Sequence, residues 1–275
     1  MFREAVDYYR RKGVLPTWLT SDEMSEILPE LRERAVWSAQ VHNAEMMEGI
    51  ADELDDLIAT GVETEAGGPE RAFDLPGSPR QRMTELADEL GVEELTSESR
   101  MSLILRTQSD MAFGYGDFKQ ATSDGALMAF PCWELKRAEW RLDPRRSDNN
   151  NRKTGIPDQY WQERWEKAGG EFYDGRMIAR KDDEIWLEIS DFGLPHDPLA
   201  FNTGYRRFDV GYKECVELGV IDPSDEVEAP EDPALSTDKT DPELEPAVKS
   251  ADLRKVMEDY GYEFDEEGAL EGLAE

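Results

Sequence analysis

The sequence predicts an α+β protein, with a helical N-terminal region, a small mixed, aromatic-rich module, an acidic linker and a short C-terminal helix. Up to about residue 125, apolar residues recur every three or four positions, which is the period of an amphipathic helix. Near Phe130 aromatic and β-forming residues begin to alternate, as they do in strands. After Ile221 the chain is rich in proline and acidic residues. We therefore expect boundaries at 1–125, 126–221, 222–249 and 250–275.

Apolar periodicity and glycines place the helices of the N-terminal region. A short helix opens the chain, and a long amphipathic helix is expected over about 29–61, with Asn43 as the one polar residue on its apolar face. A loop rich in glycine and proline covers 62–79. Two further helices are expected over about 80–91, closed by Gly91, and over 97–118, with Thr96 or Ser97 as the N-cap.

The module that follows mixes short strands with short helices. We expect a strand near 130–140, an aromatic helix over 158–169 and a last short helix over 211–221. Residues 176–189 fit either two short strands or one strand and a turn into a helix, and residues 192–210 are expected to be irregular. Five tryptophans in the module are expected to build an aromatic core: Trp133, Trp140, Trp161, Trp165 and Trp186.

The last predicted helix begins after Ser250 and is too short to be stable in water alone. It must therefore dock, either on the body of the protein or on a partner. Its apolar residues are the candidate partner-docking residues: Leu253, Val256, Met257 and Tyr260.

The charge of the chain is its strongest compositional feature. The 275 residues include 31 basic and 63 acidic ones, a formal net charge of −32. Such charges repel one another across about 10 Å at ~0.1 M salt, but only across about 3 Å at 1 M. The acidic residues also lie along the whole chain rather than in one tail. We therefore expect a protein of a halophile or of its virus.

Several classes of protein are excluded by the same composition. No apolar run approaches the ~18 residues of a membrane helix, and the N-terminus lacks the apolar stretch of a signal peptide. Cys132 and Cys215 are too few and too far apart in the sequence for a disulfide framework or a cysteine-based zinc site. We expect no membrane contact and no structural metal.

Catalytic motifs are scarce, which predicts a protein that is not an enzyme and needs no cofactor or small-molecule substrate. The nucleophile elbow, the phosphate-binding loops and the zinc-protease helix are absent from the sequence. His42 is expected to face solvent or a partner. The alternative is an enzyme carried into the cell with viral DNA, and it requires His196, Asp182 and Arg176 to converge in one cleft.

One stretch, 136–153, reverses the sign of the charge, with seven basic residues against three acidic ones. It could contact phosphate or an acidic partner, or its cations could pair with carboxylates of the same chain. Phosphate contacts weaken steeply with salt, so a protein partner is favoured over DNA in molar salt. The candidate binding residues are Lys136, Arg137, Arg141, Arg145, Arg146, Arg152 and Lys153.

The order of segments resembles the Mu F-like minor head proteins, or head morphogenesis proteins, of tailed viruses. The opening FREAVDYYRRKGVLPTWLTSDE resembles that family's N-terminal entry, and ERAVWSAQVHNAEMMEGIADELDDLIATG is similar to the helix that follows it. The family's helical signature R-x-x-x-I-x-(R/D)-T-(N/Q)-x-x-x-A-(Y/R)-x-x-G is matched by Arg100, Ile104, Thr107, Gln108, Ala112 and Gly116. FPCWELKRAEWRLDPR, GRMIARKDDEIW and LPHDPLAFNTGYRRFDV resemble its later motifs.

The resemblance covers about residues 2–221 and departs from the family near its end. A cysteine pair of the family is replaced here by Thr203 and the Arg206–Arg207 region, and a histidine after the strand is absent. No thiol or metal role can therefore be transferred to this chain.

The resemblance implies a structural virion component, bound at the portal vertex inside the capsid, that assists head assembly and DNA packaging or delivery. The implied partner is the portal protein, with packaged double-stranded DNA and the capsid protein as further candidates. The implied location is the head interior or portal vertex, and the host cytoplasm during assembly. A head–tail adaptor, another connector or tail protein, and a host regulator are the structural alternatives.

Overall fold

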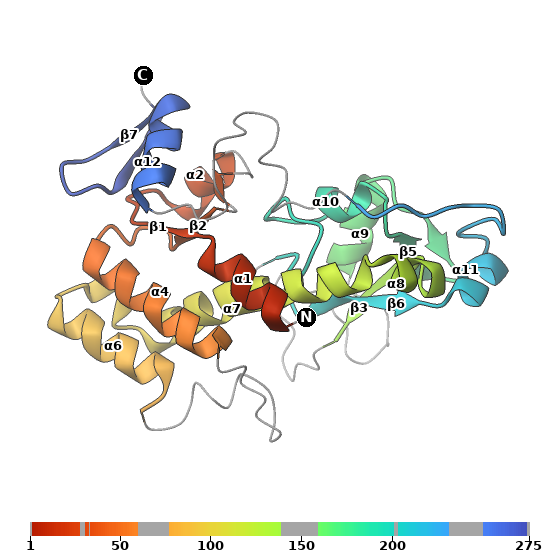
Figure 1. Cartoon of the computed structure of the whole chain (residues 1–275), viewed down its shortest axis with the longest axis horizontal. Helices are drawn as coiled ribbons and strands as arrows, with labels where there is room; N and C mark the ends of the chain where they lie inside the picture. Colours follow the sequence, from red (N-terminus) through yellow and green to blue (C-terminus); the bar gives the residue numbers. More distant parts are fainter. Residues whose placement is uncertain are drawn as a thin grey trace. The chain divides into compact units, whose positions relative to one another are not determined.

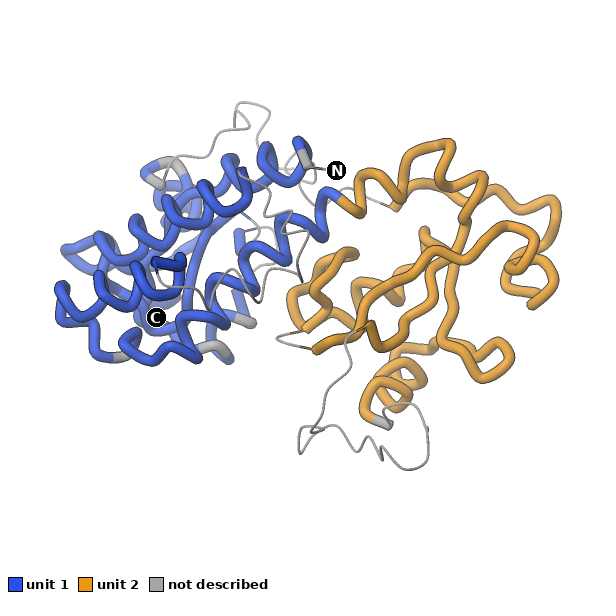
Figure 2. The backbone as a smooth tube through the Cα atoms, turned by 90° about the horizontal axis from the view of Figure 1, so that it is seen from below, with its two compact units in different colours: residues 1–116, 232–275 blue, residues 117–231 orange. Residues whose placement is uncertain are grey.

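A computed structural model describes residues 2–27, 31–32, 34–59, 77–138, 159–200, 203–230 and 250–273. The chain is an α+β protein and forms two compact units, drawn in blue and orange in Figure 2. The first unit combines residues 1–116 with 232–275, and the second comprises 117–231. The observed boundary, after Gly116, falls inside one continuous helix, so no change in the sequence pattern marks it, and the boundary expected at residue 125 lies nine residues later. The C-terminal segment, expected as a separate part, belongs to the first unit.

The first unit is mainly helical and has two small pairs of strands. Parallel strands β1 and β2 align Val14 with Val36, and antiparallel β7 and β8 form a hairpin near the C-terminus. A parallel bridge joins Thr17 to Leu270 of that hairpin. The elements, coloured along the chain in Figure 1, are α1 (Phe2–Arg10), β1 (Gly13–Leu15), α2 (Ser21–Glu26), β2 (Ala35–Trp37), α4 (Ala44–Ala59), α6 (Pro79–Glu89), η1 (Glu93–Leu95), α7 (Glu98–Ala121), α12 (Ser250–Asp259), β7 (Tyr262–Phe264) and β8 (Leu270–Leu273).

The helix expected over 29–61 begins only at Ala44, so this prediction was wrong in its first half. Residues 35–37 instead form β2, whose apolar, β-forming side chains pair with β1. Asn43, the polar exception on the expected apolar face, lies just before α4. Its side-chain Oδ1 accepts a hydrogen bond from the amide of Met46 at 2.9 Å, so it caps the helix start. The loop expected over 62–79 lies largely outside the described residues.

The two later helices of this unit are confirmed. Helix α6 starts with Ser78 as its cap and Pro79 in its first turn. Gly91 follows its end with φ +68°, a left-handed conformation that favours glycine. Helix α7 spans Glu98–Ala121 and carries the boundary between the units, after Gly116.

The C-terminal helix packs into the core of its own unit. Leu253 and Met257 of α12 are fully buried, and Val256 is partly buried against the same cluster. Their neighbours come from the first 35 residues and from the C-terminal hairpin: Leu15, Leu19, Met24, Ile27, Leu31, Ala35, Tyr262 and Leu270. The proposal of a partner for Leu253 and Met257 is thereby corrected, since side chains buried in the chain's own core cannot meet another protein.

The second unit is built on a four-stranded antiparallel sheet with strand order β4-β5-β3-β6. The structure confirms the predicted strand β3 and helices α9 and α11. For residues 176–189 it confirms the alternative of one strand followed by a helix. The elements of the second unit are α8 (Asp124–Ala129), β3 (Cys132–Arg137), α9 (Gln159–Lys167), β4 (Phe172–Tyr173), β5 (Arg176–Arg180), α10 (Ile185–Glu188), β6 (Tyr205–Val210) and α11 (Tyr212–Leu218).

Strand β6 lies in the segment 192–210 that was expected to be irregular. Its two faces both carry charged residues, with Arg206 on one and Arg207 and Asp209 on the other, so no apolar alternation marks it in the sequence. Its pairing with β3 along six residues makes it a strand. Pairing with β3, rather than a local sequence pattern, therefore determines that these residues form a strand.

Tryptophans form the core of the second unit, as the sequence predicts. Trp133 and Trp186 meet edge to face at 5.5 Å, and Trp165 contacts Trp186 at the same distance. Trp161 stacks on Tyr205, while Trp140 lies outside the described residues. Within the described ranges, no helix combines the length and apolar character needed to cross a membrane.

Candidate functional site

Two members of the predicted basic patch, Lys136 and Arg137, lie at the end of β3; the other five lie outside the described residues. The Lys136 Nζ donates to Glu134 at 2.9 Å and sits 4.5 Å from the ring centre of Phe208. The Arg137 guanidinium lies 4.9 Å from the ring centre of Tyr205. Both cations therefore contact side chains of their own unit. For Lys136 the structure supports the intramolecular pairing that was weighed against partner binding.

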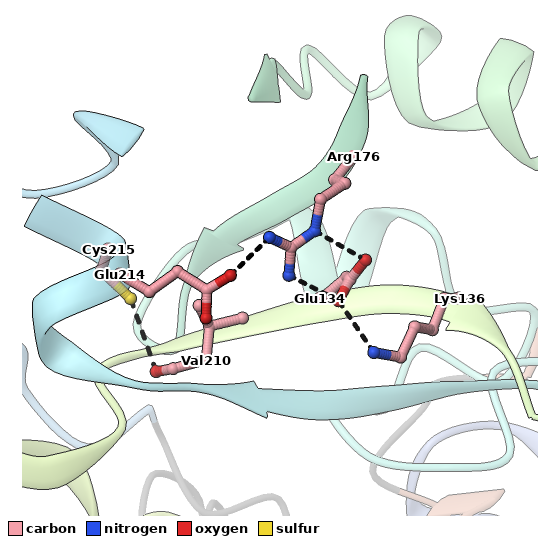
Figure 3. A network of polar contacts seen from close by, with 6 residues as sticks. All are labelled: Glu134, Lys136, Arg176, Val210, Glu214 and Cys215. Atoms are coloured by element: carbon pink, nitrogen blue, oxygen red, sulfur yellow. Dashed lines mark hydrogen bonds and ion pairs between the residues drawn. The ribbon is translucent and has the colours of Figure 1, made fainter. Parts of the chain in front are cut away.

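Glu134 is the centre of a network of ion pairs on one face of the sheet (Figure 3). Besides Lys136, it accepts two hydrogen bonds from Arg176 of β5, at 2.9 and 2.8 Å. Arg176 also donates to Glu214 of α11 at 2.6 Å. Glu134 lies opposite Ile178 in the register, which places Arg176 on the diagonal position of the same face.

The network is balanced in charge and holds its groups ionised. Burial raises the pKa of Glu134, but the hydrogen bonds from Arg176 and Lys136 outweigh it, and its pKa lies below the ordinary value of 4.5. The same contacts with Glu134 and Glu214 raise the pKa of Arg176 further. Two carboxylates face two cations, so the network fastens α11 to the sheet and leaves no excess charge to attract an anion.

The three residues required by the enzyme alternative have separate partners. Arg176 begins β5, whereas Asp182 follows its end, where it pairs with Arg180 at 2.8 and 2.7 Å. Arg176 and Arg180 are four positions apart along the strand, a distance of about 13 Å. His196 is fully buried, and its Nδ1 bonds to the carbonyl oxygen of Asp197 at 2.9 Å. The structure thus places these residues in different contacts rather than in one catalytic group.

His42 differs from its predicted role as a solvent- or partner-facing residue on a helix. It precedes α4, and its ring stacks on Trp18 with centroids 3.4 Å apart. The Trp18 Nε1 donates to Asp265 at 2.8 Å, in the turn of the C-terminal hairpin. Among the parts of the chain that are described, no group of three or more metal-ligating side chains could hold a metal ion.

Buried cations beside Trp133 were missed by the sequence reasoning. The Lys181 Nζ is fully buried and contacts Asp209 at 2.7 Å and the Ala121 carbonyl oxygen at 2.8 Å. Burial lowers its pKa, while the contact with Asp209 opposes that shift. On the Trp133 ring, the Arg207 guanidinium lies 4.2 Å from the centroid, and Trp133 Nε1 donates to Asp209 at 3.0 Å. The only sequence signal was a lysine directly after a strand.

The residues that carry the family resemblance make specific contacts within the first unit. Arg100 donates to the carbonyl oxygen of Ala39 at 2.7 Å, and the Gln108 amide donates to that of Trp37 at 3.1 Å. Both donors lie on α7, eight residues apart and therefore on a similar side of the helix. Two matched motifs that are 60 to 70 residues apart in the sequence are thus joined by hydrogen bonds.

The two cysteines, too few and too far apart in the sequence to predict a disulfide framework or a zinc site, meet in the second unit. Both are fully buried in one apolar cluster with Ile178, Val210 and Ile221. Neither spacing nor a motif marks this pair; only the return of α11 over the sheet brings it together.

Comparison of the chain with protein-family models, curated proteins and solved structures finds no match. The class defined by the geometry is therefore an α+β protein of two units whose candidate catalytic residues are held in ion pairs or hydrogen bonds.

Proposed function

We propose that this protein is a structural minor head protein of a tailed virus of haloarchaea. In this proposal it binds the portal protein at the portal vertex, inside the capsid, and assists head assembly and DNA packaging or delivery. It acts without catalysis, and DNA or the capsid protein are secondary contacts. The proposal rests on the ordered resemblance to Mu F-like minor head proteins over residues 2–221.

The observation that carries the proposal is the contact between two of the resembling motifs. Arg100 and Gln108 of the α7 motif hold the backbone at Ala39 and Trp37, directly within the second motif. Thr107, Gln108 and Ala112 of the same helix are also buried. Motif residues that form one packed arrangement are more informative than short matches scattered over a surface.

The terminal helix still offers one residue to a partner. Tyr260, at the end of α12, is 44% exposed, whereas Leu253 and Met257 are fully buried. An exposed tyrosine suits a protein interface because it combines a large apolar ring with a hydroxyl group. We therefore restrict the docking proposal to Tyr260, since Val256 is partly buried against the core of its own unit.

The test is co-expression with the product of the preceding gene, the expected portal, followed by purification in molar KCl and light scattering. We expect a stable complex that contains a ring-shaped portal oligomer. Tyr260→Ala should weaken binding by about tenfold if the tyrosine anchors the interface. Tyr212→Ala is the matched control, because Tyr212 is also exposed, at 39%, but lies in the second unit.

A folded protein that elutes alone in the presence of an assembled portal ring would contradict the proposed partner. A regular twelve-fold ring of this chain would instead favour the head–tail adaptor alternative. An equal loss of binding in both tyrosine variants would remove Tyr260 as the anchor but would leave the portal as the partner.

A further inference from the structure

The thiols of Cys132 and Cys215 lie side by side between the sheet and α11. Cys132 is the first residue of β3 and lies directly opposite Val210 of β6. Cys215 lies on α11, and its Sγ is 3.4 Å from the carbonyl oxygen of the same Val210. Figure 3 shows Cys215 directed back toward that carbonyl. A single residue of β6 therefore contacts both cysteines.

The two thiols are hydrogen-bonded to each other and differ in acidity. This bond lowers the pKa of Cys215 and raises the pKa of Cys132. Cys215 donates its S–H to the Val210 carbonyl oxygen and is the more acidic of the two thiols. When Cys215 loses its proton, a thiolate lies beside the Cys132 thiol, which is the arrangement that precedes disulfide formation because only the thiolate is nucleophilic.

We propose that Cys132 and Cys215 form an intramolecular disulfide when the protein meets a peroxide. The bond would clamp α11 to β3 and close a loop of more than 80 residues. The sequence contains no other cysteine, so this is the one disulfide that a single chain can form.

The reaction uses one molecule of hydrogen peroxide and both thiols. The Cys215 thiolate attacks one peroxide oxygen, an S–O bond forms, the O–O bond breaks, and the departing hydroxide takes a proton to become water. The Cys132 sulfur then loses its proton and attacks the Cys215 sulfenic acid. The S–S bond forms as the S–O bond breaks, and a second water leaves. Two electrons pass from the thiols to the peroxide.

Access to the buried pair depends on the opening of α11. The helix is fastened to the sheet by the ion pair of Glu214 with Arg176, whereas Glu217 pairs with Lys213 of the same helix, at 3.5 Å. Loss of the first ion pair should raise the population of the open form, and loss of the second should not. Glu214→Gln is therefore the informative variant and Glu217→Gln its matched control.

The experiment treats the full-length protein with hydrogen peroxide in molar KCl, then denatures it and alkylates the remaining thiols. We expect a monomer that is lighter by two hydrogen atoms, takes up no alkyl group and is restored by dithiothreitol. Peptide mapping should join the peptides of Cys132 and Cys215. Glu214→Gln should speed the reaction by about two- to fivefold, as an exposed ion pair of this kind allows, and Glu217→Gln should leave the rate unchanged.

The single variants test the order of the steps. In Cys132→Ser, Cys215 should give a sulfenic acid that dimedone traps, whereas in Cys215→Ser the remaining Cys132 should react much more slowly. Glutathione added to the same tube is the positive control for peroxide reactivity. If the glutathione is fully oxidised while the protein still has two alkylatable thiols, the proposal is overturned. A product that is a disulfide-linked dimer or a sulfinic acid would also overturn it. The assay uses no partner, so its outcome is separate from that of the portal experiment.

Discussion

The two units differ in net charge and in the side chains that form their cores. The first unit has 15 basic and 38 acidic residues, a balance of −23, and its core joins the two ends of the chain through apolar side chains. The second has 16 basic and 25 acidic residues, a balance of −9, and places cations beside its aromatic core. The first unit is therefore closed by apolar side chains and carries the larger net charge, whereas the second places ion pairs beside its aromatic core.

Carboxylates have different surroundings in the two units. In the first unit the exposed face of α4 carries Asp52 and Asp56, whereas the neighbouring Glu53 and Asp55 form ion pairs with arginines of other helices. In the second, Asp209 and Glu134 each join two or more groups on the sheet. Loss of an exposed carboxylate such as Asp52 should matter little, and loss of Asp209 should matter considerably.

The largest expected effect comes from removing the apolar closure of the first unit. Leu253→Ala combined with Met257→Ala should unfold this unit, because each change costs about 2–5 kcal/mol and a domain has only about 5–15 kcal/mol of stability. Calorimetry in molar KCl should then show a remaining transition from the second unit. Glu258→Ala, an exposed change on the same helix, should leave both transitions in place. Two unchanged transitions in the double variant would contradict the closure.

The second-largest effect is expected from lowering the salt concentration, which should destabilise the two units to different extents. At ~0.1 M salt the screening length is about three times that at 1 M, so repulsion grows most in the unit with the larger net charge. Amide hydrogen exchange should show α4 losing protection at a higher KCl concentration than β3. Earlier loss of protection in β3 would show that net charge does not set the order.

Asp209→Asn should destabilise the second unit by about 3 kcal/mol, because it leaves the buried Lys181 cation without its counter-ion. The pKa of Lys181 in the folded protein lies below its ordinary 10.5. Between these two values the unfolded chain holds a proton that the folded chain has released, so this group adds stability as pH rises. The deficit of the variant should therefore shrink toward pH 10.5. Denaturant titrations at several pH values measure this loss of unfolding free energy. A loss that grows with pH would contradict the assignment of Asp209 as the counter-ion of Lys181.

The smallest effect is expected for Glu134→Gln, about 1–2 kcal/mol at neutral pH, since Arg176 keeps its contact with Glu214. The pKa of Glu134 is below 4.5, so its contribution is complete above that value and is lost as pH falls through the folded pKa. The variant and the natural protein should converge in acid. Glu166→Gln, on the exposed side of α9, is the control and should show no such convergence.

Sequence patterns predicted best where one element buries one face. The period of apolar residues predicted α6, α7 and α12, and alternation of aromatic residues predicted β3. The prediction failed at β2, where Ala35, Val36 and Trp37 continue an apolar helical period, and at β6, where charges occupy both faces. In both cases the partner strand, β1 or β3, comes from a distant part of the chain.

Candidate sites were harder to predict because contact chemistry depends on tertiary partners. Lys136 and Glu134 are two residues apart, and they share a face only because residues 132–137 form a strand. The contact of Arg176 with the same Glu134 depends on how β3 and β5 align. The burial of Leu253 depends on the N-terminal segment, more than 200 residues away. The meeting of Cys132 with Cys215 depends on α11 turning back after β6.

The sequence by itself determined the α+β class, most of the helices, the acidic charge that favours molar salt and the aromatic core of the second unit. These follow from composition and from short periodic patterns, which act within one element. Only the tertiary structure decided that the chain ends close one unit, that Lys181 and Arg207 are buried cations, and that the two thiols are neighbours. These features depend on contacts between segments far apart in the sequence, which a local pattern cannot predict.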